Sequence, residues 1–156
     1  QAGGTLKGKV AEAENLTWPD ASFDLITGAG SHSYVDHETF YKEISRLLRP
    51  GGSFVCVDSL NHNPIYRFNR YLHYLRGNRS KSTLKRMPRL RSIRLMGDLI
   101  GPTRSSFHGN LSFLSPLMVK LLSEDRWARW SNYFDQQFPF MNRMAFKFVT
   151  TAKKLT

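Results

Sequence analysis

The stretch that decides the fold is residues 23–58, which read FDLITGAGSHSYVDHETFYKEISRLLRPGGSFVCVD. It begins with a short apolar run, Phe23 to Thr27, that predicts a buried strand closed by a glycine turn. Apolar residues then recur at helical spacing from His37 to Leu48, after the candidate N-cap Asp36, and a proline and two glycines end the helix. A second apolar run, Ser53 to Val57, predicts another buried strand. Strand, helix and strand in this order are typical of a right-handed parallel unit, so we expect an α/β domain.

The remaining segments are predicted by the same criteria of periodicity and turn residues. Pro64 to Leu75 is expected to be an amphipathic helix, with its apolar residues on one face and Arg67 and Arg70 on the other. The other expected elements are a short strand at Lys9–Ala13, a polar basic loop at Gly77–Pro88, a helix at Arg89–Ile100, a weak strand at Thr103–Phe113, helices at Pro116–Ser123 and Glu124–Phe134, and a final strand at Ala145–Ala152.

Length and composition favour one domain. The chain has 156 residues, of which 40% are apolar, and this is enough for a packed core. No apolar run is long enough to span a membrane and the first residues lack a signal-peptide pattern, so we predict a soluble, cytoplasmic protein. The single cysteine, Cys56, falls in an apolar run and is expected to be a buried small hydrophobe rather than a catalytic thiol.

Charge is distributed unevenly along the chain. Residues 1–58 hold five Lys and Arg against eight Asp and Glu, a balance of −3, whereas residues 59–156 hold eighteen against four, a balance of +14. No acidic residue lies between Ser59 and Gly97, where ten residues are basic. Such a surface either meets an anionic partner, such as phosphate, nucleic acid or lipid headgroups, or is a solvated helix face.

An ordered series of motifs carries a family resemblance. Residues 11–27 read AEAENLTWPDASFDLIT, and the stretch GAGSHSYVDHETFYKEISRLLRPGGSFVCVD follows directly. Together they resemble the small-molecule and glycan-directed class I methyltransferases, which use S-adenosylmethionine. The match is close over residues 10–58, and the tail loosely resembles methyltransferases of bacterial surface-saccharide clusters.

The resemblance implies a set of cofactor residues. Glu12 and Ala13 occupy the place of the residues that meet the adenine, and a carboxylate there could also accept from the ribose hydroxyls. Trp18 would cover the adenine, or else cap the core. Gly28 and Gly30 follow the family's fourth strand and would line the methionine end of the cofactor, at the carboxyl end of a strand where open α/β sheets place their ligands.

The resemblance also places the acceptor after that strand. Methyl transfer is an in-line displacement, so the protein mainly aligns the acceptor and supplies a base only where a proton must leave. His32 is the candidate base; the alternative is a structural, hydrogen-bonded histidine. The candidate acceptor contacts are Tyr34, Asp58, Arg79, Lys81 and Arg86, from a basic helical insertion at residues 62–102 and the strand ends. No set of residues has metal-ligand spacing, so no metal is predicted.

One part of the family pattern is not found. Gly3, Gly4 and Gly8 follow no strand, so they do not form the glycine-rich turn that cradles the methionine and ribose. The expected fold is therefore a partial Rossmann-like one: the later strands of a mostly parallel sheet with flanking helices and a C-terminal antiparallel strand, in a single, N-terminally incomplete (truncated) methyltransferase domain over residues 1–156. We expect its exposed edge strand to be covered by a missing N-terminal half or by a second copy in a homodimer.

Two functions are open at this point. The first is methyl transfer from S-adenosylmethionine to a small anionic or saccharide-type acceptor, with the basic segment holding phosphates. The second is a non-catalytic methyltransferase-like module that binds nucleic acid or an anionic membrane surface through the same segment. No recognised nucleic-acid motif is present. The aromatic residues between Trp127 and Phe140 are expected to be core, although a lid or a dimer surface is also considered.

Overall fold

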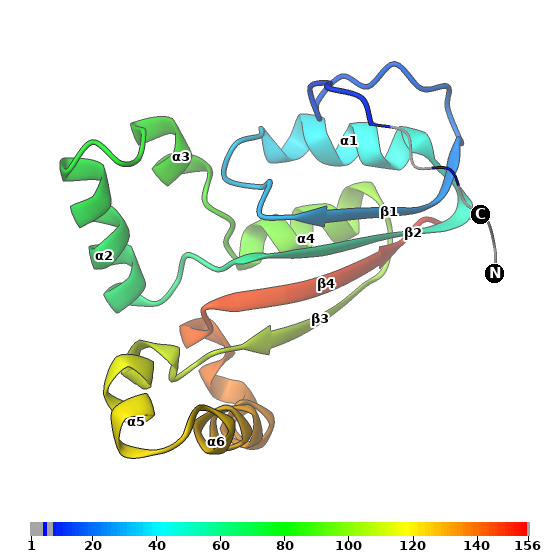
Figure 1. The fold of residues 1–156 in the computed structure, drawn as a ribbon. Helices are drawn as coiled ribbons and strands as arrows, with labels where there is room; N and C mark the ends of the chain where they lie inside the picture. Colours follow the sequence, from blue (N-terminus) through cyan, green and yellow to red (C-terminus); the bar gives the residue numbers. More distant parts are fainter. Residues whose placement is uncertain (1–4, 6–7, 156) are drawn as a thin grey trace.

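The computed structural model describes residue 5 and residues 8–155, and its centre is a four-stranded sheet in the order β1-β2-β4-β3 (Figure 1). Helices α1 and α4 cover one face of this sheet, and α2 and α3 lie beyond the ends of its strands. The strands are β1 (Phe23–Ala29), β2 (Leu48–Ser59), β3 (Thr103–His108) and β4 (Lys147–Lys153). The helices are α1 (His37–Leu47), α2 (Pro64–Leu75), α3 (Lys81–Arg86), α4 (Leu90–Leu99), η1 (Ser112–Leu114), α5 (Ser115–Leu121), α6 (Glu124–Gln137) and η2 (Pro139–Met144).

The sheet is mixed. Strand β1 pairs in parallel with β2, as the strand-helix-strand pattern predicts, and β4 pairs antiparallel with both β2 and β3. The predicted α/β class with flanking helices and an antiparallel final strand is therefore confirmed. The expectation of a mostly parallel sheet is wrong for the described residues, because β4 pairs antiparallel on both of its sides and only β1 and β2 are parallel. In the described part of the chain, β1 is an edge strand, and its Leu25 is more than half exposed.

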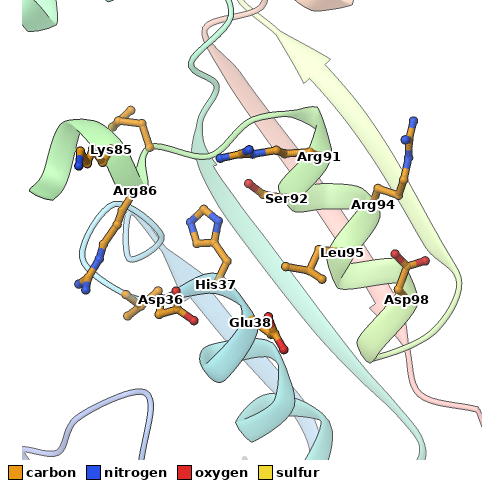
Figure 2. Close-up of a pocket in the computed structure, with 12 residues that line it drawn as sticks. Asp36, His37, Glu38, Lys85, Arg86, Arg91, Ser92, Arg94, Leu95 and Asp98 are labelled. Carbon is orange, nitrogen blue, oxygen red and sulfur yellow. The ribbon is translucent and has the colours of Figure 1, made fainter.

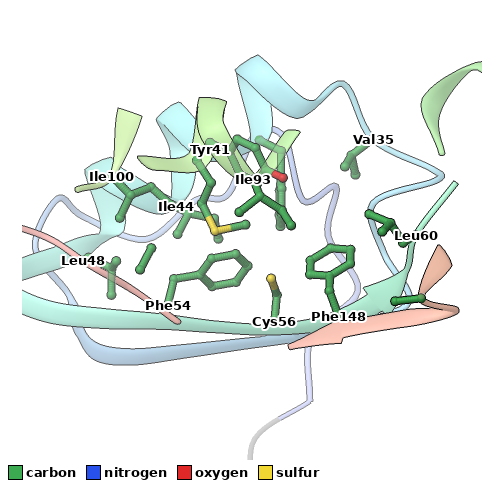
Figure 3. Packing of buried hydrophobic residues seen from close by; sticks show 14 residues of the cluster. Val35, Tyr41, Ile44, Leu48, Phe54, Cys56, Leu60, Ile93, Ile100 and Phe148 are labelled. Carbon is green, nitrogen blue, oxygen red and sulfur yellow. The ribbon is translucent and has the colours of Figure 1, made fainter. Parts of the chain in front are cut away.

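The core lies between the sheet and helices α1 and α4 (Figure 3). Phe54 and Phe148 rise from β2 and β4, and Tyr41 of α1 and Met96 of α4 cover them; all four side chains are fully buried. Cys56 is buried in the same layer, so the prediction of a buried small hydrophobe is confirmed, and burial raises the pKa of its thiol to about 12.

Local signals set the ends of α1. Asp36 accepts a hydrogen bond from the backbone N–H of Thr39 at 3.1 Å and caps the helix, as predicted. The helix ends at Leu47 and β2 begins at once with Leu48, earlier than the predicted strand start. Gly52 is required in this crossing, because a Cβ atom there would lie 2.9 Å from the carbonyl oxygen of Arg49.

The predicted strand at Lys9–Ala13 is wrong. This segment is irregular and mostly exposed, because no strand of the described chain lies beside it to complete a ladder. Gly3 and Gly4 lie outside the described residues. The predicted basic loop at Gly77–Pro88 contains the short helix α3, which Ser80 caps through the backbone N–H of Thr83 at 3.2 Å.

Helix α2 has the predicted bounds, but the face that was expected to be buried is exposed. Phe68 and Tyr71 are 63% and 51% exposed, whereas Arg70, expected on the solvent side, is only 6% exposed. The aromatic tail also departs from the expectation of core. Trp127 is buried, but Trp130 and Phe140 are largely exposed.

None of the helices in the described part of the chain has the length and apolar character needed to cross a membrane.

Candidate functional site

The carboxyl ends of β1 and β2 bring His32 and Asp58 together. The two strands run in parallel, with Ala29 beside Val57. His32, shortly after β1, and Asp58, near the end of β2, therefore meet at the same edge of the sheet. Asp58 Oδ2 accepts from the backbone N–H of His32 and lies 3.0 Å from its Nδ1 atom. This double contact fixes the loop between β1 and α1 against β2.

Hydrogen bonds favour the ionised form of Asp58. Burial alone would raise the pKa of this carboxyl group, but the bonds from His32 and from the backbone N–H of Ser59 outweigh it and lower the pKa below its ordinary value. A carboxylate that accepts from Nδ1 fixes the imidazole with Nδ1 protonated, which leaves Nε2 as the basic nitrogen.

The Nε2 atom of His32 faces the core. The side chain is fully buried, and Nε2 has no hydrogen-bond partner among the described residues. The rings of Phe40, Tyr41 and Phe148 surround the imidazole, with ring centroids 5.7 to 6.0 Å from its own centroid. His37 Nε2 donates to the carbonyl oxygen of His32 at 2.9 Å, and burial lowers the pKa of His37.

Three of the predicted cofactor residues line one cavity. Ala13, Trp18 and Gly28 lie around a space of about 260 Å³ at the carboxyl end of β1, and Phe54 also lines it. A Cβ atom on Gly28 would contact the Phe54 ring at 3.5 Å, so a larger residue would occupy part of this space. The Trp18 ring is about one third exposed and packs edge-on against Phe23, with centroids 5.6 Å apart.

The other two predicted cofactor residues lie outside that lining. The Glu12 side chain is exposed, and the backbone carbonyl oxygen of Glu12 accepts from the backbone N–H of Asn15 in a turn. Gly30 adopts a left-handed conformation with φ of 67° and donates its backbone N–H to Val57 at 3.0 Å. Its role in the structure is a turn that glycine tolerates.

A second cavity, of about 470 Å³, lies between α1, α3 and α4 (Figure 2). Among the predicted acceptor residues it is lined by Arg86 alone, and Tyr34 and Asp58 lie outside its lining. His37 points into the space between α1 and α4, and Arg86 reaches from α3 across the loop before α1. Arg86 Nη1 donates to the carbonyl oxygen of Tyr34 at 3.0 Å, which ties the basic segment to the candidate site. Arg91 and Arg94 of α4 also line this cavity.

Arg79 and Lys81 do not line it. Lys81 is exposed at the start of α3, and Arg79 Nη1 lies 3.8 Å from the sulfur of Met87. The structure thus joins Ala13 with Trp18 and Gly28, His32 with Asp58, and Tyr34 with Arg86, in three neighbouring groups.

Two buried polar residues, Arg70 and Asn110, were not predicted from the sequence. Arg70 belongs to α2 and is buried, although the helical pattern alone predicts it on the solvent side. Asn110 is fully buried with neither side-chain polar atom hydrogen-bonded in the described chain, and Asp135 accepts from its backbone N–H at 3.0 Å. Asn110 and Asp135 are 25 residues apart in the sequence, and no local pattern predicts their contact.

Within residue 5 and residues 8–155, no three His, Cys, Asp or Glu side chains gather as metal ligands do. That no metal takes part remains a prediction.

Comparison with known proteins agrees with the predicted family. Residues 2–56 match the family model described as a methyltransferase domain. A demethylmenaquinone methyltransferase from Listeria welshimeri is 37% identical over 67 residues, which are 40% of this chain and 28% of the relative. A fatty-acid O-methyltransferase from Mycolicibacterium smegmatis is 36% identical over 62 residues, which are 39% of this chain and 23% of the relative. The chain thus spans less than a third of either relative.

Solved structures extend the likeness to nearly the whole fold. An S-adenosylmethionine-dependent methyltransferase from Methanosarcina mazei has a TM-score of 0.56 at 22% identity and covers 99% of this chain and 70% of its own. A phosphoethanolamine N-methyltransferase from Haemonchus contortus, solved with phosphomonomethylethanolamine and S-adenosylhomocysteine, has a TM-score of 0.55 at 12% identity and covers 94% of this chain and 37% of its own. The family model thus supports the predicted family over residues 2–56, and the solved structures support the methyltransferase-like fold.

Proposed function

We propose that this chain, which carries part of a class I S-adenosylmethionine-dependent methyltransferase domain, forms one wall of the cofactor site and takes part in methyl transfer to a small-molecule acceptor. The observation that carries the proposal is the cavity of Ala13, Trp18 and Gly28 at the carboxyl end of β1. It lies in the segment that matches the methyltransferase family, at the strand end where open α/β sheets bind ligands.

The residues around this cavity fit the cofactor. Gly28 leaves room beside Phe54 that any side chain would reduce, and the partly exposed Trp18 ring offers a flat apolar face for an adenine. Glu12 and Gly30 would contact the cofactor from the rim. When bound, S-adenosylmethionine supplies a methyl group on a positively charged sulfur, which makes the carbon a target for nucleophilic attack.

We assign His32 a positioning role as the first choice. Its bonds to Asp58 hold the loop after β1, and this loop carries Tyr34 and leads into α1. Proton acceptance by Nε2 remains the alternative; it needs the acceptor to approach from the buried side, where Phe40 and Tyr41 now stand. The two roles predict different pH profiles: a base gives a rate that falls as His32 becomes protonated, and His32→Asn would abolish that limb. A positioning residue changes KM and leaves the profile shape unaltered.

The acceptor would lie against Tyr34, Asp58 and Arg86, beside the cavity between α1, α3 and α4. Arg79 and Lys81 would then act at longer range, as positive charge around the entrance. We propose an anionic or saccharide-type acceptor because this segment has no acidic residue from Ser59 to Gly97. Relatives are named for menaquinone and fatty-acid substrates, so a lipid-linked acceptor fits the same proposal.

The test is calorimetric titration with S-adenosylhomocysteine. Gly28→Val should abolish binding by filling the cavity, and Trp18→Ala should weaken it about tenfold or more through the lost ring contact. Trp130→Ala is the matched control, since Trp130 is an exposed tryptophan of α6 far along the chain.

Two forms of the protein should be titrated: residues 1–156, and the protein with any residues that its gene encodes before Gln1. Binding by either form that Gly28→Val abolishes supports the proposal. Absence of binding by both forms, or binding that survives Gly28→Val, would contradict it.

A further inference from the structure

A third cavity, of about 410 Å³, opens between α2 and α3, away from the candidate cofactor wall. Three arginines line it, Arg67, Arg70 and Arg89, together with Phe68 and Tyr71 of α2. Cationic groups and exposed aromatic rings thus share one opening.

Arg70 is the feature that needs explanation. Its side chain is 6% exposed, and Nη1 donates to the carbonyl oxygen of Leu60 at 3.0 Å and to Asn61 Oδ1 at 3.1 Å. None of the ion pairs formed by the described residues includes it. Buried charges are normally paired, so a guanidinium that lines a cavity without a carboxylate points to an anion from outside the chain.

The surroundings of Arg70 add positive charge. Burial, together with the nearby Arg79, lowers the pKa of Arg70 to about 10, although Asp58 and Tyr66 act in the opposite direction. Burial also lowers the pKa of His62, with further contributions from Arg89 and Arg143. The positive charges of the arginines repel one another, and an anion in the cavity would relieve that repulsion.

The outer wall of the cavity is apolar. Phe68 and Tyr71 are more than half exposed, and on the same helix Ile65 and Leu75 are 46% and 61% exposed. Helix α2 therefore turns its apolar residues outward beside the arginines. A ligand with an anionic head and an apolar chain would satisfy both parts of the site.

We infer that the cavity between α2 and α3 binds the phosphate group of an amphiphilic molecule, with Arg67, Arg70 and Arg89 on the phosphate and Phe68 and Tyr71 against the apolar chain. Arginine suits this role because its planar guanidinium offers two parallel donors to phosphate oxygens. The site goes beyond the proposed methyl transfer and needs no cofactor. Its ligand is either a soluble lipid phosphate or the headgroup of a lipid in a membrane.

The test measures binding to three probes without S-adenosylmethionine. They are inorganic phosphate, decyl phosphate below its micelle concentration, and phosphatidylcholine vesicles with and without phosphatidic acid.

Arg67→Gln and Arg89→Gln should each weaken binding about tenfold, the usual effect of losing a charge-assisted hydrogen bond. Arg104→Gln, on the exposed face of β3, removes the same charge elsewhere and should leave binding unchanged. Arg70→Lys keeps the charge without the fork, and its urea unfolding curve checks that it folds.

Each outcome decides the inference. If decyl phosphate binds saturably and Arg67→Gln and Arg89→Gln weaken the binding, the inference holds with a soluble ligand. If the protein binds only vesicles that contain phosphatidic acid, and the same variants weaken that binding, the inference holds with a membrane lipid. The inference is overturned by no binding, by equal affinity for inorganic and decyl phosphate, or by equal losses in Arg104→Gln. A negative result leaves the cofactor proposal intact, because S-adenosylhomocysteine titration tests that separately.

Discussion

Helices α1 and α2 have 11 and 12 residues, each with an apolar and a polar face, yet they are placed in opposite ways. Helix α1 buries Phe40, Tyr41, Ile44 and Leu47 against the sheet. Helix α2 buries only Arg70 and exposes its apolar residues. The difference lies in what each helix can reach: α1 returns over two paired strands, whereas α2 leaves the end of β2 and packs against α3.

The comparison shows that periodicity predicts that a helix has an apolar face, and leaves open what that face contacts. It also separates two tasks. The segment around α1 has the acidic balance and the packed core, so it supplies a rigid strand edge. The segment around α2 has the positive balance and exposed rings, which suit a ligand or surface that the chain itself does not provide.

The largest expected effect comes from a matched pair of phenylalanines. Phe40→Ala in α1 should lower the free energy of unfolding by about 3–5 kcal/mol, because Phe40 is 4% exposed in the core. Phe68→Ala in α2 should change it by less than about 0.5 kcal/mol. Urea unfolding measures both, and equal losses would show that α2 packs its apolar face in solution.

A smaller effect separates the helix caps. Asn63 is fully buried; it accepts from the backbone N–H of Ile65 and donates to the carbonyl oxygen of Met144, both at 2.9 Å. Asn63→Ala should cost about 2 kcal/mol, because it removes a cap and leaves a buried carbonyl without its donor. Asp36→Ala, at the exposed cap of α1, should cost about 1 kcal/mol. The reverse order in urea unfolding would mean that α2 is not anchored through Met144.

The pair of His32 and Asp58 should make stability depend on pH. The pKa of Asp58 is lowered in the folded protein, so its contribution is fully present above the unfolded value of about 3.9 and is lost as pH falls through the lower folded value. Unfolding measured across the acid range should show this loss, and Asp58→Asn should remove that part of the slope. Asp24→Asn, in an exposed ion pair with Arg49, is the control and should leave the slope nearly unchanged.

The smallest effect is electrostatic and compares His62 beside α2 with His37 in α1. Burial lowers the pKa of both, but nearby arginines lower that of His62 further. Raising the salt concentration screens the arginines and should raise the pKa of His62 more than that of His37. Nuclear magnetic resonance titration of the ring protons measures both values, and equal shifts would contradict an excess of cations around α2.

Much of the fold followed from local patterns. The bounds of α2 were predicted correctly, and β1, α1 and β4 were predicted within a few residues, because runs of apolar residues and strong caps mark them. The strand at Lys9–Ala13 failed because a strand needs a neighbour, which its own five residues do not reveal. Helix α3 was missed because its six residues include a single apolar one, Leu84, and so carry no apolar periodicity.

The candidate site was predictable where it depends on parallel pairing. His32 follows β1 and Asp58 lies near the carboxyl end of β2, so their meeting is a consequence of parallel pairing. The cavity of Ala13, Trp18 and Gly28 followed from the family resemblance. Burial of Arg70 was not predictable, because it depends on how α2 sits against Leu60 and Asn61, and these contacts belong to the tertiary fold.

The position of β4 has a consequence for the order of assembly. It is the last strand in sequence, yet it lies between β2 and β3, which bond to each other only through it. During synthesis the ribosome therefore releases β2 and β3 long before the strand that joins them exists. Until Lys147–Lys153 emerges, the apolar surfaces of Phe54 and Cys56 lack Phe148 as a neighbour, so we expect the nascent chain to fold late and to depend on chaperones that cover exposed strands.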